Sequence, residues 1–107
     1  MTTWIVSRHP GAVEWLRRQG IEADKQVAHL EASMVAAGDR VIGTLPVNII
    51  AELCSRGASY FHLDLRLLPE QRGRELSVDD MDAAGAQLIQ YAAEQIVADQ
   101  TAGAEQL

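Results

Sequence analysis

The sequence predicts an α/β fold, with a mainly parallel sheet flanked by helices. Short apolar runs rich in β-forming residues alternate with stretches whose apolar residues recur at helical spacing. The order is strand, helix, strand, strand, helix, strand, helix, and such alternation is typical of parallel sheets. With 107 residues the chain is the size of one domain. We expect residues 1–98 to form that domain and residues 99–107 to be a polar tail.

The first strand is expected over Thr2–Val6, and a turn of polar residues follows it. Pro10 is compatible with the first turn of a helix, where the missing N–H is not needed. That helix is expected to end at Gly20, because glycine readily adopts the left-handed conformation that closes helices. Residues 21–30 are ambiguous, with Gln26–Leu30 the better candidate for a short strand.

The middle of the chain contains two further strands and a helix. Residues 37–39 predict a turn, and 40–45 form a short apolar run of the buried parallel kind. Pro46 opens a helix that ends near Gly57. Residues 59–67 alternate polar and apolar side chains, so we expect a half-exposed strand.

The last predicted element is a helix that begins after Ser77. Asp79 and Asp80 lie in its first turn, where carboxylates suit the helix dipole. A polar loop over residues 69–74 precedes it. Its expected packing stripe comprises Ala84, Leu88, Tyr91, Ala92, Gln95 and Ile96.

Net charge is −6, but the charges are unevenly distributed. All nine basic residues lie between Arg8 and Arg74, whereas seven acidic and no basic residues follow from Glu75 onward. Binding of long nucleic acid is not expected, because it needs an extended basic face. A compact anion held by a few arginines fits the composition, since guanidinium groups match phosphate oxygens.

Two polar loops are expected to face one cleft. Right-handed crossovers place the loops after the first and third strands at the same edge of the sheet, and α/β sheets bind ligands outside the carboxyl ends of their strands. The loops are Ser7-Arg8-His9 and Gly43-Thr44-Leu45-Pro46-Val47-Asn48.

The first loop combines a hydroxyl, a guanidinium and an imidazole with a helix N-terminus, which is an anion site. Arg8 can hold a phosphate with two hydrogen bonds, and His9 can exchange a proton near neutral pH. The alternative is that Ser7 caps the helix and His9 is a surface turn residue. In the second loop, Gly43 allows close backbone approach and Thr44 offers a hydroxyl. Gly43 can equally ease strand packing, and Asn48 can simply cap its helix.

Other candidate residues have a structural explanation. His29 and His62 have no partner spacing that suggests a metal, and we expect them to be structural or on the surface. Cys54 is the only cysteine, so thiolate metal clusters are excluded and a core position is expected. Neither a membrane span nor a signal peptide is evident, which predicts a cytoplasmic protein. No cofactor or metal is expected.

Two resemblances bear on function. Arg8-His9 resembles the Arg-His-Gly motif of histidine phosphatases, but Pro10 replaces the glycine and no second histidine motif follows. A match over nearly the whole chain resembles the small CRISPR-associated Csx-sixteen family. It is carried by segments 7–12, 27–30, 38–39, 41–48 and 72–77 and by Asp80-Met81, and it fades beyond about Ala84.

The second resemblance implies a Rossmann-like, CARF-like dimer that acts as a ring nuclease. Such proteins accompany type III CRISPR systems, bind the second messenger cyclic tetra-adenylate and cut it to linear products, which switches the response off. Arg8, His9 and Ser7 match the family's segments and also carry chemistry, so we take them as the catalytic candidates. Ligand-binding candidates are Gly11, Gly43, Thr44, Asn48, Arg72, Arg74 and Glu75. A module that senses or sequesters the ring without cutting it is the alternative.

The chemistry of the two loops suits that reaction. A ribose 2′-hydroxyl can attack the neighbouring phosphate without a metal, provided that the protein fixes the geometry and stabilises the developing charge. We expect Arg8 to bind the phosphate, His9 to transfer a proton, and Ser7, Thr44 and Asn48 to position phosphate or ribose. A two-fold homodimer matches the symmetry of a four-nucleotide ring.

Overall fold

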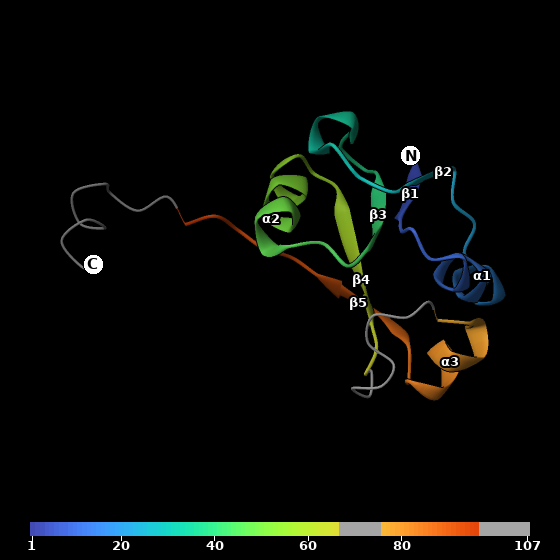
Figure 1. Cartoon of the computed structure of the whole chain (residues 1–107). Helices are drawn as coiled ribbons and strands as arrows, with labels where there is room; N and C mark the ends of the chain where they lie inside the picture. Colours follow the sequence, from blue (N-terminus) through green and yellow to red (C-terminus); the bar gives the residue numbers. More distant parts are fainter. Residues whose placement is uncertain (67–75, 97–107) are drawn as a thin grey trace, which may run out of the picture.

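The structure is a computed structural model that describes residues 1–66 and 76–96. Its described part contains a five-stranded sheet in the order β2-β1-β3-β4-β5 (Figure 1). The strands are β1 (Thr3–Val6), β2 (Lys25–Val27), β3 (Arg40–Gly43), β4 (Ser59–Asp64) and β5 (Gln87–Tyr91). The helices are α1 (Pro10–Arg18), α2 (Val47–Ser55) and α3 (Val78–Ala83), and η1 (Ala32–Met34) is a short 3₁₀ turn.

The first four strands are parallel, which confirms the predicted α/β fold. β1 pairs with β2 on one side and β3 on the other, and β3 pairs with β4. Only β5, along the outer side of β4, is antiparallel among the described strands. The carboxyl ends of β2, β1, β3 and β4 therefore meet at one edge of the sheet. No helix in the described ranges is long and apolar enough to cross a membrane.

Helices cover both faces of the sheet and create two cores (Figure 1). One core joins α2 and η1 to Trp4 and Tyr60, which are 2% and 0% exposed. The other joins α1 and α3 to Ile5 and Leu63. Because β4 contributes to both cores, the expected half-exposed strand is wrong: Tyr60 on one face and Leu63 on the other are both buried. A central strand of an α/β sheet is covered on both sides.

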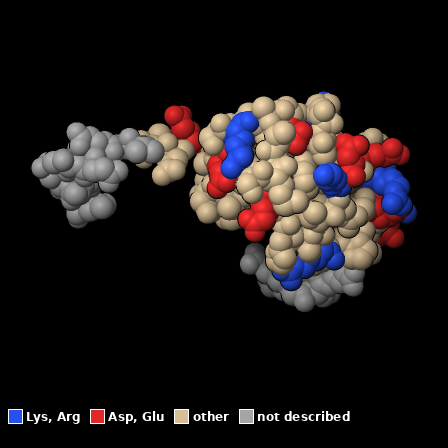
Figure 2. Space-filling view, turned by 90° about the horizontal axis from the view of Figure 1, so that it is seen from above, with Lys and Arg blue, Asp and Glu red and all other residues tan. Residues whose placement is uncertain are grey.

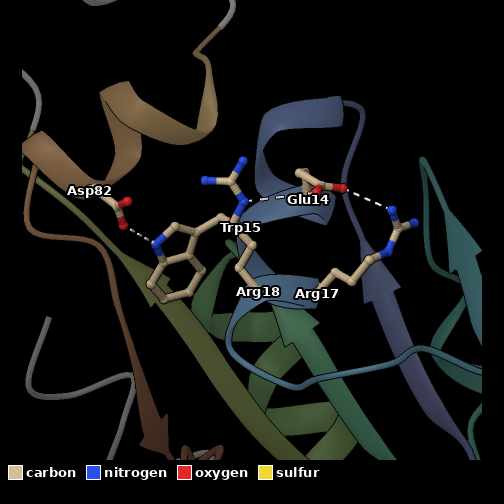
Figure 3. A network of polar contacts seen from close by, with 5 residues as sticks. All are labelled: Glu14, Trp15, Arg17, Arg18 and Asp82. Atoms are coloured by element: carbon tan, nitrogen blue, oxygen red, sulfur yellow. Dashed lines mark hydrogen bonds and ion pairs between the residues drawn. The ribbon is translucent and has the colours of Figure 1, made fainter.

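α1 and α3 pack together on one face of the sheet. Trp15, 5% exposed, donates its indole N–H to Asp82 of α3 over 2.8 Å (Figure 3). Glu14 lies between Arg17 and Arg18 on the exposed side of α1, with ion-pair distances of 2.8 and 3.9 Å. Such exposed pairs contribute little to stability, so the buried indole and its hydrogen bond carry the packing.

The backbone of α1 approaches the start of α3 closely. A Cβ placed on Gly11 would lie 1.9 Å from the carbonyl oxygen of Leu76. Only glycine fits there without backbone movement. α1 ends as predicted, with Gly20 at φ 83° directly after its last turn.

The predicted C-terminal helix is correct at its start and wrong beyond Ala84. Ser77 caps α3 through a capping box with Asp80, as the sequence indicates. The helix stops at Ala83, Gly85 adopts φ 70°, and residues 87–91 form β5. The open side of β4 supplies hydrogen-bond partners for this segment, and its β-forming residues fit a strand. Apolar residues at helical spacing were therefore a misleading signal here.

A buried carboxylate ties the opposite, amino-terminal edge together. Asp39, 5% exposed, accepts hydrogen bonds from the backbone N–H groups of Ala36 and Thr2 and from the indole of Trp4, over 2.9, 3.0 and 3.2 Å. The bond from Ala36, followed by those from Thr2 and Trp4, lowers the pKa of this carboxyl below 3.8. The predicted turn at 37–39 is confirmed, with Gly38 at φ 88°.

Candidate functional site

The candidate site lies where the parallel strands end. Val27 of β2 is level with Val6 of β1, and Gly43 of β3 is level with His62 of β4. Gly43 in turn packs against Val6, since a Cβ on this glycine would lie 3.1 Å from the Val6 carbonyl oxygen. The loops that follow β1 and β3 thus leave adjacent strands at one edge, as the order of elements predicts.

The first loop turns sharply from β1 into α1. Ser7 donates its backbone N–H to the carbonyl of Val27, and its hydroxyl oxygen accepts the N–H of His9 over 3.1 Å. His9 is the residue before the helix, and its side chain forms no capping hydrogen bond. Ser7 therefore shapes the turn and does not cap the helix. Arg8 and His9 are exposed, at the positive end of α1.

Arg8 contacts the end of the neighbouring strand. Its Nη2 lies 2.8 Å from Nε2 of His29, in the loop after β2. A guanidinium is only a donor, so Nε2 of His29 accepts and its proton lies on Nδ1. His29 was expected to be structural or a surface residue; it is exposed, and it orients the arginine at this edge.

The pairing of Arg8 differs from that of the helix arginines. Arg17 and Arg18 pair with Glu14, and Arg56 pairs with Glu52 at 3.6 Å. Within the described residues Arg8 has no acidic partner to neutralise its positive charge. Elsewhere charges are mixed: on the face seen in Figure 2, basic and acidic side chains alternate and form no continuous basic surface.

The hydroxyl of Tyr60 holds the start of the loop after β3 in place. This hydroxyl lies 2.9 Å from both the carbonyl oxygen of Gly43 and the backbone N–H of Leu45, and 2.7 Å from Nδ1 of His62. Burial raises the pKa of Tyr60, so the hydroxyl stays protonated. The loop that carries Thr44 is thus held by a side chain from the next strand.

The predicted ligand residues of the second loop differ in their surroundings. Gly43 is buried and serves the packing of β3 against β1. Thr44 and Asn48 are exposed. Asn48 does not cap α2; it lines a groove of about 880 Å³ between α2 and residues 92–95. Its side chain is therefore accessible from the α2 face of the sheet.

For the remaining predicted ligand residues, no contact within the described part of the chain brings them to this edge. Gly11 packs against Leu76, and both line a cavity of about 500 Å³ between α1 and α3. Arg72, Arg74 and Glu75 lie outside the described residues. Among described residues no cluster of three His, Cys, Asp or Glu side chains could hold a metal. Cys54 is partly buried and packs against the α2 core.

His62, expected to be structural or on the surface, is half-buried and lies level with the last residue of β3, beside Tyr60 and Tyr91. The sequence contains one signal for this position. The alternation of β4 puts His62 on the same face as Tyr60, and parallel pairing puts it beside the second loop.

Comparison with protein families places the chain. Residues 4–94 match a family described as "Putative CRISPR-associated protein (Cas_VVA1548)". The chain belongs to this family. Comparisons with curated proteins and with solved structures find no match. The matched range of this CRISPR-associated protein contains both loops, the Tyr60–His62 pair and all of the sheet except Thr3. The CRISPR association predicted from the sequence is thus confirmed.

Proposed function

We propose that this CRISPR-associated protein is a ring nuclease that binds cyclic tetra-adenylate and cuts it to linear di-adenylate, ending the type III antiviral response. The main support for this proposal is the position and pairing of Arg8. Its guanidinium has no acidic partner among described residues and lies at the positive end of α1, at the carboxyl edge of a parallel sheet. A phosphodiester is the anion that such an arrangement suits best in a CRISPR-associated protein.

The proposed reaction is a transesterification within the ring. The ribose 2′-oxygen forms a bond to the adjacent phosphorus, and the bond from phosphorus to the 5′-oxygen breaks. The 2′-hydroxyl proton passes to a base, and the leaving 5′-oxygen takes a proton from an acid. Two such cuts yield di-adenylates with a 2′,3′-cyclic phosphate and a 5′-hydroxyl. The step needs positioning and charge stabilisation and no metal.

The described residues supply these functions as follows. Arg8 binds the phosphate and stabilises the charge that develops on it. His9 transfers a proton, and its exposed ring has no hydrogen-bond partner in the described part of the chain. Thr44 and Asn48 position phosphate or ribose, while Ser7 holds the turn through its bond to the His9 amide.

We further propose that the active form is a two-fold dimer. Arg8, His9, Thr44 and Asn48 are all exposed on one chain. A single domain of this size therefore leaves the reacting phosphate in water, whereas a second copy can enclose it. A two-fold axis also presents two equal sites to a ring of four equal nucleotides.

The test compares Arg8→Ala with Arg17→Ala. Loss of a group that stabilises the transition state lowers the cleavage rate by about 100-fold or more. Arg17 is equally exposed on α1 but pairs with Glu14, away from the loop, so its removal leaves the rate unchanged. Rates are measured with radiolabelled ring under single-turnover conditions, and melting curves verify that both variants are folded. Equal rates for Arg8→Ala and wild type would refute the assignment.

A further inference from the structure

The hydrogen bonds around Tyr60 determine where His62 carries its proton. The hydroxyl has one proton to donate and two lone pairs to accept with. The Leu45 N–H must donate to it, because a backbone N–H cannot accept. The Gly43 carbonyl must accept from it, because a carbonyl cannot donate. The hydroxyl proton is then used, and one lone pair is left for Nδ1 of His62.

Nδ1 of His62 must therefore be the donor in its 2.7 Å contact with Tyr60. The neutral ring then carries its proton on Nδ1, and its lone pair is on Nε2. In the described part of the chain, Nε2 has no hydrogen-bond partner. Tyr60 and Tyr91 flank the ring, each with its centroid 5.8 Å away, and fix its plane. The result is an oriented imidazole whose acceptor nitrogen has no hydrogen-bond partner among the described residues.

The place of His62 in the sheet relates it to the two loops. β3 lies between β1 and β4, so His62 is two strands away from the end of β1, about 10 Å at usual strand spacing. Gly43, the last residue of β3, is between them and level with His62. A phosphate held above the end of β3 would have the Arg8-His9 loop on one side and His62 on the other.

We propose that His62 is the general base of this site, with Nε2 accepting the 2′-hydroxyl proton, and that Tyr60 is the residue that positions it. This inference rests on the proposed ring cleavage and divides its proton transfers. The proton leaves the 2′-oxygen for Nε2 of His62 as the new bond to phosphorus forms. His9, on the other side of the phosphate, gives a proton to the departing 5′-oxygen. A neutral base and a protonated acid on opposite sides suit an in-line displacement.

One substitution separates the roles of the two ring nitrogen atoms of His62. In His62→Asn the side-chain amide replaces Nδ1 and keeps the donor to Tyr60, but nothing replaces Nε2. We expect this variant to fold and bind the ring like wild type and to cut it about 100-fold or more slowly, the usual contribution of a general base. Wild-type cutting by His62→Asn would overturn the role of His62 and leave the ring-nuclease proposal standing. A wild type that does not cut would instead overturn both.

Nitrogen NMR of ¹⁵N-histidine protein provides a readout that does not depend on activity. The neutral His62 ring should show the Nδ1–H form, whereas an unrestrained imidazole favours Nε2–H. Tyr60→Phe removes the acceptor, so the Nδ1–H signature should disappear and kcat should fall; because Tyr60 also holds the loop that carries Thr44, ring binding should weaken as well. An Nε2–H signature at His62 in folded wild type would overturn the positioning by Tyr60. If Tyr60→Phe does not fold, the wild-type spectrum and His62→Asn still decide.

Discussion

Asp39 shows how one side chain connects three segments. Its two carboxylate oxygens accept from the loop before β3, from the start of the chain and from the buried Trp4. Three N–H donors point at this side chain, so each of its oxygen atoms must accept and neither can carry a proton. An ionised carboxylate meets this condition. The Asp39 carboxylate should therefore stabilise the fold in a pH-dependent way.

We expect Asp39→Asn to lower the melting temperature at pH 7, because an amide N–H₂ would face a backbone or indole donor. The folded-state pKa of Asp39 is lowered from 3.8, so its contribution to stability is complete above that value and is lost as pH falls through the folded pKa. The gap between variant and wild type should narrow below about pH 4. Glu22→Gln, at an exposed site in the loop before β2, is the control. A gap that stays constant from pH 7 to 3 would contradict this account.

Some properties of the candidate site residues were predictable from the sequence, and others were not. The polar character and exposure of Arg8, His9 and Thr44 follow from local pattern, because strand-end loops are exposed. The roles of Tyr60 and His62 do not, since they depend on hydrogen bonds to a different strand. Gly43 illustrates both cases: the sequence left open close backbone approach or strand packing, and the structure shows packing against the Val6 backbone.

Among the secondary-structure elements, α1 is constrained by its neighbours at two points. Its N-terminus supports the proposed phosphate site, and its second residue, Gly11, contacts the backbone of Leu76. The same helix is tied to α3 through Trp15 and Asp82 (Figure 3). The position of the first loop thus depends on how α1 and the start of α3 fit together.

Gly11→Ala should lower the free energy of unfolding by about 3 kcal/mol, because its methyl group would overlap the Leu76 carbonyl and force the backbone apart. Gly20→Ala is the matched control. No atom lies within 4 Å of its added Cβ, so only the φ of 83° opposes alanine, at about 1 kcal/mol. Urea denaturation of both variants measures the difference. Equal losses would mean that the contact with Leu76 relaxes freely.

The elements themselves were predictable where local signals and pairing agree. β1, β3, α1 and α2 begin and end near their expected boundaries, because turn residues and apolar runs mark them. β2 is short and ends at Val27, within the region that was ambiguous. The prediction of a helix over residues 84–96 was wrong because the same apolar spacing also fits a short edge strand. The unpaired side of β4, which the local sequence does not reveal, favours the strand.

In the molecule as a whole, the sheet brings residues that are distant in sequence to one edge. Arg8 contacts His29 from the loop after β2, and Tyr60 holds the loop after β3. These contacts follow from parallel pairing, so the convergence of the loops was predictable from the order of elements. The way in which a dimer would enclose a ring was not predictable, because the exposed residues of one chain do not specify how a second chain packs against it.

Ring cleavage is tested by incubating purified wild-type protein, in EDTA, with radiolabelled cyclic tetra-adenylate and separating the products. We expect conversion to di-adenylate with a 2′,3′-cyclic phosphate, and light scattering on the same sample should give the mass of a dimer. An intact ring that stays bound would contradict cleavage and indicate a sensor or a sequestering protein. An intact ring that does not bind would contradict the proposed function altogether.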